Sequence, residues 1–100
     1  MEASSIPQVK ISKSGNEFKI LNVTGTKGSA MDTHFSTGEA ILSVFRGEAV
    51  LKLGEKEMHL LPGELVIIPA EEPHTLSVLN DFEANVIMAI DSQIKFLNKQ

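Results

Sequence analysis

Apolar and polar residues alternate with a period of two along most of the chain. The alternating runs are five to eight residues long and are interrupted by Gly, Pro, Asn or charged pairs. Because successive side chains of a strand point to opposite faces, this period predicts β-strands with one buried face. We therefore expect an all-β chain without any helix longer than about two turns.

The runs predict about nine short strands. These cover residues 9–11, 18–24, 30–37, 40–45, 49–53, 58–60, 65–68, 74–78 and 84–90. Turn residues separate them, among others at positions 14–16, 25–28, 47–48, 54–55, 62–63 and 80–81. Connections this short join antiparallel neighbours, so the strands should form a sandwich or a barrel.

Two stretches depart from simple alternation. The apolar phase changes between Ile20 and Leu21, which predicts a bulge there, because one extra residue in a strand inverts the phase. The last ten residues allow two structures. The polar pair 91–92 is suited to cap a short helix, whereas 94–96 fits a strand equally well.

Composition supports one packed domain spanning residues 1–100. A chain of 100 residues with 42% apolar and 22% charged residues is too short for two cores and too apolar for a disordered tail. The sequence contains no cysteine, which excludes disulfides, a thiolate nucleophile and sulfur ligands for a metal. A metal would have to bind His, Asp or Glu.

The net charge of the chain limits the kinds of molecule that it is expected to bind. Nine basic against thirteen acidic residues give a net charge of −4, and Arg46 is the only arginine. We expect no nucleic-acid binding, because that binding depends on cationic contacts to phosphates. The longest fully apolar run, 65–70, is far shorter than the ~20 residues of a membrane helix. The first residues lack the pattern of a secretory signal, so we expect a cytoplasmic location without membrane binding.

The three histidines are not equivalent. His59 lies between Met58 and Leu60, which alternation turns inward, so His59 should face solvent. His34 and His74 lie on strand faces with small, polar or core residues, and each follows a segment rich in Gly or Pro. They are either half-buried imidazoles with satisfied hydrogen bonds or members of a functional site.

Alternation also assigns the faces of the strand that carries His34. One face should hold Asp32, His34 and Ser36, and the other Met31, Thr33 and Phe35.

Residues 28–47 resemble the first motif of the cupin superfamily. That motif reads glycine, five residues, His-x-His, three or four residues, glutamate, six residues, glycine. Gly28, His34, Ser36, Ala40 and Gly47 stand at these positions.

Residues 63–78 are similar to the second cupin motif, which reads glycine, five residues, Pro-x-Gly, two residues, histidine, three residues, asparagine. The corresponding residues are Gly63, Pro69, Glu71, His74 and Val78. Together the motifs cover roughly half of the chain. The resemblance implies a single antiparallel cupin-type β-barrel, also called a double-stranded β-helix or jelly roll.

The resemblance also implies where a metal would bind. Cupins with a metal use two motif-1 histidines, the motif-1 glutamate and the motif-2 histidine; here these positions are His34, Ser36, Ala40 and His74. Two ligands remain, whereas catalytic zinc takes three protein ligands and non-haem iron two histidines and a carboxylate. Asp32 on the same face is one candidate third ligand.

Glu39 is a second candidate, if a bulge turns it inward in place of Ala40. A divalent transition metal on His34 and His74 is therefore the one cofactor that the resemblance leaves open.

Three functions follow as hypotheses. The first is a barrel that binds a small polar molecule without a full metal site. The expected ligand-binding residues are His34, Ser36, His74, Leu42 and Met58, with Val44, Leu60 and Leu76 completing the apolar wall. The second is a metal-dependent oxygenase or isomerase that uses His34, His74 and a third ligand from outside the motifs. The third is an interaction protein with a vestigial pocket.

The outer side of two strands is also apolar. Met31 and Phe35 should lie opposite His34, and Ile41 and Phe45 opposite the pocket side of run 40–45, which is apolar on both faces. That run should be covered on both sides. Because exposed apolar patches usually mark interfaces, we expect a homodimer. The alternative is a monomer whose ends fold back over the patch.

Overall fold

The computed structural model describes residues 6–97, and within this range the chain forms eight strands and no helix. The strands are β1 (Gln8–Ser14), β2 (Phe18–Gly25), β3 (Ala30–Ser36), β4 (Ala40–Leu53), β5 (Lys56–Leu60), β6 (Leu65–Ile68), β7 (His74–Ala89) and β8 (Ile94–Phe96). All the strand pairs are antiparallel. This confirms the all-β prediction. The described residues offer no apolar helix that could span a membrane.

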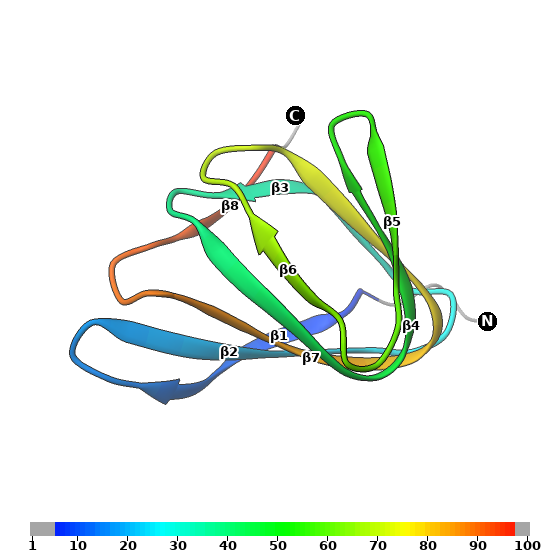
Figure 1. Ribbon diagram of the computed structural model, residues 1–100, viewed down its shortest axis with the longest axis horizontal. Helices are drawn as coiled ribbons and strands as arrows, with labels where there is room; N and C mark the ends of the chain where they lie inside the picture. Colours follow the sequence, from blue (N-terminus) through cyan, green and yellow to red (C-terminus); the bar gives the residue numbers. More distant parts are fainter. Residues whose placement is uncertain (1–5, 98–100) are drawn as a thin grey trace.

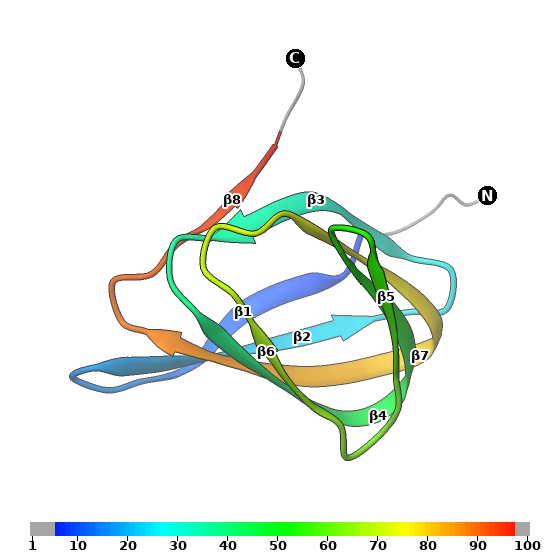
Figure 2. The same ribbon diagram turned by 45° about the horizontal axis from the view of Figure 1, so that its top comes forward.

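Two long strands, β4 and β7, hold the sheet together. They pair with each other from Ala40↔Met88 to Leu53↔His74. The first part of β7 also pairs with β3, and its last part pairs with β2. Strands β5 and β6 pair with β4. Because both long strands bend, the sheet curls around a central space (Figures 1 and 2). The curled antiparallel sheet agrees with the expected cupin-type barrel.

The turns expected at 47–48 and 80–81 are wrong. Both segments lie inside the long strands, where the β4–β7 register shifts between Val44 and Ala49. Gly47 explains why the strand can bend here. Its φ is +86°, and a Cβ atom at this position would lie 1.9 Å from the carbonyl oxygen of Asp81. Glycine therefore permits a close crossing of two strands, where the sequence pattern indicates a strand end.

The bulge expected near Ile20 exists, but its extra residue lies on the neighbouring strand. Ile11 pairs with Leu21 and Lys13 pairs with Ile20, so Ser12 of β1 has no partner, whereas the β2–β7 register is regular. At the other end of the chain, residues 94–96 form a strand rather than part of a helix. The final three residues of the expected terminal segment lie outside the described residues.

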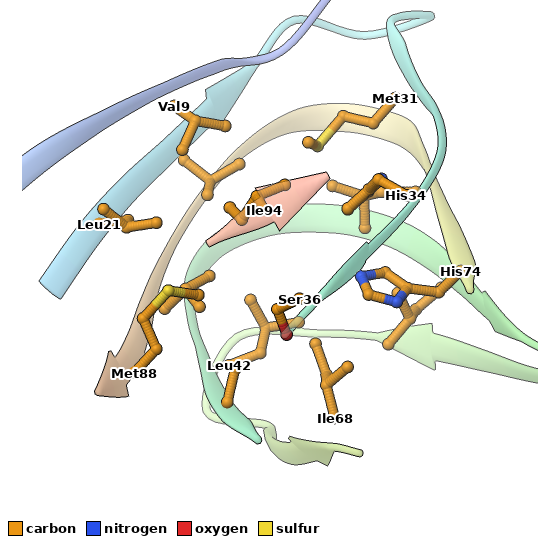
Figure 3. A pocket seen from close by; sticks show the side chains of 15 residues that line it. Val9, Leu21, Met31, His34, Ser36, Leu42, Ile68, His74, Met88 and Ile94 are labelled. Atoms are coloured by element: carbon orange, nitrogen blue, oxygen red, sulfur yellow. The ribbon is translucent and has the colours of Figure 1, made fainter. Parts of the chain in front are cut away.

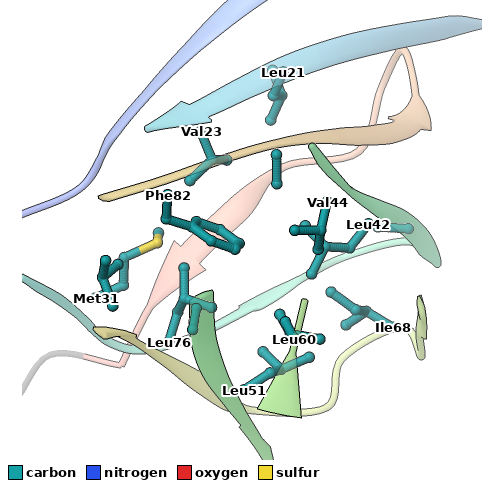
Figure 4. Packing of buried hydrophobic residues seen from close by; sticks show 14 of the residues in the cluster. Leu21, Val23, Met31, Leu42, Val44, Leu51, Leu60, Ile68, Leu76 and Phe82 are labelled. Atoms are coloured by element: carbon teal, nitrogen blue, oxygen red, sulfur yellow. The ribbon is translucent and has the colours of Figure 1, made fainter. Parts of the chain in front are cut away.

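Apolar side chains from most strands fill the interior (Figure 4). Phe82, Leu51 and Leu60 are almost completely inaccessible to solvent. Burial of one such side chain contributes about 1.5–3 kcal/mol to folding. The packed side chains leave a small cavity, which is lined by residues of most strands.

Candidate functional site

A small cavity lies inside the curled sheet, with a volume of about 50 Å³. Three of its lining residues are polar: His34, Ser36 and His74 (Figure 3). The apolar lining consists of Val9, Leu21, Val23, Met31, Ala40, Leu42, Leu51, Ile68, Leu76, Val86, Met88 and Ile94. The cavity is therefore an apolar chamber with one polar corner.

The two histidines come from directly paired positions of adjacent strands. His34 of β3 pairs with His74 at the start of β7. Their ring centroids are 4.3 Å apart and the ring planes make an angle of 67°, an edge-to-face contact. Both residues are buried, with exposed fractions of 6% and 7%. The structure thus brings together the two histidines that motif spacing singled out.

Each imidazole is held by the backbone two residues before it in the chain. Nδ1 of His34 lies 2.7 Å from the carbonyl oxygen of Asp32, and Nδ1 of His74 lies 2.9 Å from that of Glu72. A carbonyl oxygen only accepts, so Nδ1 must carry the proton in both rings. In a neutral imidazole, Nε2 is then an unprotonated acceptor. Among the described residues, Nε2 of neither ring has a hydrogen-bond partner.

The surroundings of His34 keep its ring neutral. Burial lowers the pKa of His34 below its ordinary value of 6.5, and the adjacent His74 imidazole lowers it further. The hydrogen bond to the Asp32 carbonyl raises the pKa, but by less than burial lowers it. His34 is therefore an uncharged acceptor at neutral pH.

Ser36 completes the polar corner. Its side chain is buried, and its hydroxyl donates to the carbonyl oxygen of Gly38 at 2.7 Å. The single hydroxyl proton is therefore engaged in this hydrogen bond, and Oγ can only accept a further hydrogen bond through its lone pairs. On the side of β8, the Phe96 ring lies 5.1 Å from the His34 ring, measured between centroids. The corner consequently offers acceptors and an aromatic neighbour, and no free donor.

The expected faces of β3 are wrong at its first half. Met31 is buried and lines the cavity together with His34 and Ser36, whereas Asp32 is exposed. The register of β3 with β7 shifts between Met31 and His34, and this irregularity inverts the alternation. Phe35 is half-buried, in register with Lys95 of β8.

Some residues of the expected pocket wall lie elsewhere. Leu42 and Leu76 line the cavity as expected. Met58 does not: it is half-buried on β5, where it pairs with Leu51 and packs against the core. Val44 and Leu60 belong to the core rather than to the cavity lining.

The donor set does not fit a catalytic metal. Asp32 and Glu39, the two candidate third ligands, are both exposed, and Ala40 occupies the inward position beside Glu39. Among residues 6–97, no three His, Cys, Asp or Glu side chains come together. Two imidazoles and a serine hydroxyl lack the carboxylate of non-haem iron sites and the third strong ligand of catalytic zinc. We therefore derive no chemistry through a metal.

Residues near both ends of the described chain also line the cavity, which sequence reasoning missed. Val9 reaches it from β1 and Ile94 from β8. These two strands are the two ends of the strand order β1-β2-β7-β3-β8. The alternating pattern is consistent with an inward-facing Val9 side chain. It does not predict that Val9 and Ile94 line the same cavity, because the two residues lie far apart in the sequence.

His59 lies on the surface, as alternation predicts. Its Nε2 pairs with Oε2 of Glu48 at 2.5 Å, and Oε1 of Glu48 accepts from Asn80 at 2.8 Å. This cluster is outside the barrel and does not contribute to the cavity.

The sequence matches the family described as "Cupin domain" over residues 23–90. Comparison with curated proteins gives no significant match.

Solved structures of similar fold agree. A cupin superfamily protein from Desulfitobacterium hafniense superimposes with a TM-score of 0.77 at 20% identity, covering 91% of this chain and 84% of that chain. For a cupin-like protein from Thermotoga maritima the TM-score is 0.79 at 20% identity, with coverages of 91% and 75%.

An enzyme also shares the fold. The DMSP lyase DddQ from Ruegeria pomeroyi gives a TM-score of 0.83 at 19% identity, and the match covers 92% of this chain but 52% of the lyase. At such identities the likeness extends to the fold alone.

Proposed function

Because this chain belongs to the cupin domain family, we propose that it is a small-molecule-binding barrel whose ligand occupies the cavity beside His34 and His74. The ligand has a compact apolar body and a neutral hydrogen-bond donor, such as a hydroxyl or an amide N–H. The donor bonds to Nε2 of one of the two histidines.

One observation carries this proposal: both histidines donate their Nδ1 proton to the backbone carbonyl two residues before them. Each therefore keeps one acceptor nitrogen without a protein partner among the described residues. A buried acceptor without a partner costs about 1–3 kcal/mol. A ligand that donates a hydrogen bond recovers that free energy, and one that only accepts does not.

The apolar lining supports the rest of the assignment. Most of the cavity wall consists of aliphatic side chains and methionines. A charged ligand would lose its hydration here without an opposite charge to replace it. The preferred ligand class is therefore uncharged and mainly apolar, which refines the small polar molecule suggested by the sequence.

A matched pair of probes tests the proposal. Cyclopentanol and cyclopentanone have nearly the same size and shape, but only the alcohol donates a hydrogen bond. We expect cyclopentanol to shift the amide resonances of β3 and β7 in an NMR titration, with at least about tenfold tighter binding than cyclopentanone. Equal binding of the two probes, or none, would contradict the assignment.

Two variants supply the controls. His34→Phe keeps a ring in place but removes the acceptor, and we expect it to reduce the preference for the alcohol over the ketone. The His59→Ala change on the outer surface removes a histidine without touching the cavity and should leave the preference unchanged.

A further inference from the structure

The curled sheet leaves the cavity open on the side where β1 and β8 lie. Within residues 6–97, β1 pairs only with β2, and β8 pairs only with β3. Val9 of β1 and Ile94 of β8 nevertheless line the same cavity (Figure 3). Two strands that border one cavity without hydrogen bonds between their backbones leave a gap in its wall, which we call the β1–β8 opening.

Apolar side chains continue from the cavity to the surface at this opening. Ile11 of β1 pairs with the cavity residue Leu21, so Ile11 lies on the cavity-facing side of its strand. Phe96 of β8 pairs with His34 and lies on that side for the same reason. Ile11 is nevertheless 61% exposed, Phe96 is 51% exposed and Val9 is 37% exposed. Solvent therefore reaches cavity-facing side chains of both strands.

The charged residues of these two strands face away from the opening. Lys10 lies between the two cavity-facing side chains of β1, and Lys95 lies between those of β8. Because successive side chains of a strand alternate, both lysines point to the outer side. On β2, Lys19 pairs with the cavity residue Met88, and its Nζ donates to the carbonyl oxygen of Ser92 at 2.7 Å. The rim that β1 and β8 supply is therefore apolar and uncharged.

The cavity alone is too small for an extended ligand. Its volume is about 50 Å³, whereas pockets that enclose a drug-sized molecule measure about 300–1,000 Å³. A ligand whose donor reaches Nε2 of His34 or His74 fills this space with the atoms next to the donor. Any longer part of the molecule has to leave the cavity, and the β1–β8 opening provides an apolar path.

We propose that the ligand is a linear amphiphile with a neutral hydrogen-bond-donating head, such as a medium-chain primary alcohol or primary amide. The head lies beside the two histidines, and the alkyl chain leaves through the β1–β8 opening, where it packs against Ile11 and Phe96. This inference rests on the proposed function, which supplies the head, and adds the length and the course of the chain.

An alkyl chain fits this opening better than the surface of a second protein. Val9 and Ile94 belong both to the cavity lining and to the opening, because Val9 is partly exposed and Ile94 is half-buried. The apolar surface is therefore continuous from the cavity to solvent, and one thin molecule can cover it. A protein surface would cover Ile11 and Phe96 but would leave the histidine acceptors without a partner, which costs free energy.

A series of straight-chain alcohols tests the length of the ligand. The full chain is titrated with 1-butanol, 1-hexanol and 1-octanol, and binding is followed through the amide resonances of β3 and β7. Each added CH₂ group should tighten binding by about two- to fourfold, the range between half and full burial. An affinity independent of chain length, with cyclopentanol still bound, would overturn this inference and leave the proposed function intact. Failure of every alcohol to bind would contradict both.

Control residues for the variants come from the outer side of β4 and β6. Phe45 is 53% exposed and Ile67 is 56% exposed, and neither lines the cavity. Ile41, which pairs with Ile67, is also 38% exposed. The expectation that the run 40–45 is covered on both sides is therefore wrong within the chain.

Two matched pairs of variants test the course of the chain. Ile11→Ser and Phe96→Ser should each weaken the binding of 1-octanol by about three- to tenfold, because they remove apolar surface from the opening. Ile11→Ser should leave the binding of 1-butanol within about twofold of wild type, since a short chain stays in the cavity. Ile67→Ser and Phe45→Ser should change neither affinity. Equal effects of the two pairs would overturn the proposed course.

Intermolecular nuclear Overhauser effects give a second measurement on the wild-type chain, which does not depend on the folding of any variant. The terminal methyl group of bound 1-octanol should lie close to the side chains of Ile11 and Phe96. The CH₂ group next to the hydroxyl should lie close to the rings of His34 and His74. Contacts of the methyl group with the buried Phe82 instead would show that the chain enters the core, and they would overturn the proposal.

Discussion

His34 and His74 pair directly across β3 and β7, and each donates its Nδ1 proton to the carbonyl two residues before it, in Asp32 and Glu72. The same local hydrogen bond therefore occurs twice, once within β3 and once between the first residue of β7 and the loop before it. It sets both rings without help from a ligand, so the two Nε2 atoms are oriented before anything binds. Preorganised acceptors of this kind lower the entropic cost of binding.

The pKa of His34 leads to a prediction about stability. Burial lowers this pKa in the folded state below 6.5, so the unfolded chain binds more protons between the two values. Stability should therefore fall as the pH decreases below about 6.5 and level off, for this group, below the folded pKa. Urea denaturation of wild type and of His34→Gln across this range measures the difference. A difference that is independent of pH would contradict the lowered pKa.

Ligand binding should depend on pH in the same direction. Protonation of His34 converts Nε2 from an acceptor to a donor. The affinity for cyclopentanol should therefore decrease as the pH is lowered through the folded pKa of His34, while the weak affinity for cyclopentanone does not decrease in parallel. Titrations at several pH values test this, and parallel curves for both probes would exclude the histidine as the acceptor.

Gly47 should be the glycine least tolerant of substitution. Gly47→Ala combines a φ of +86° with a Cβ atom 1.9 Å from the Asp81 carbonyl oxygen, and we expect a loss of more than about 3 kcal/mol. Gly63→Ala is the matched control, because its φ is +93° but no atom lies within 4 Å of the added Cβ. It should lose only about 1–2 kcal/mol. Equal losses in urea denaturation would show that the close crossing is unimportant.

Substitution of Glu71 by glycine should increase the stability of the fold rather than reduce it. Glu71 is the only non-glycine residue with positive φ among the described residues, at 64°, and it stands where the second cupin motif has glycine. Glu71→Gly removes the left-handed strain of about 1–2 kcal/mol but adds freedom to the unfolded chain. We expect a net gain of a few tenths to 1 kcal/mol. Thermal unfolding measures it, and a loss of stability would indicate that the Glu71 side chain stabilises the fold.

The sequence predicts the strands and the two histidines well, because both depend on short-range spacing. Alternation identifies the inward residues of β4, and motif spacing singles out His34 and His74. The irregular pairing of β3 between Met31 and His34 cannot be predicted from the sequence, because the intervening residues still alternate in polarity. Its consequence is large: Asp32 turns outward and Met31 turns inward.

The full lengths of β4 and β7 could not be predicted from the sequence for a related reason. Gly47 and the pair 80–81 have the composition of turns, yet they face each other at a bend where two strands cross. Only the three-dimensional pairing distinguishes a bend from a turn. The contributions of Val9 and Ile94 to the cavity depend in the same way on contacts between the two ends of the chain.

The tautomers of His34 and His74 test the central claim most directly. In a ¹⁵N NMR spectrum of protein labelled in the histidine rings at neutral pH, we expect both cavity histidines to carry the proton on Nδ1 and to have an unprotonated Nε2. Cyclopentanol should shift at least one of these Nε2 resonances, and neither probe should shift those of the surface residue His59. Protonated Nε2 atoms in the cavity, or Nε2 resonances unaffected by cyclopentanol, would contradict the account.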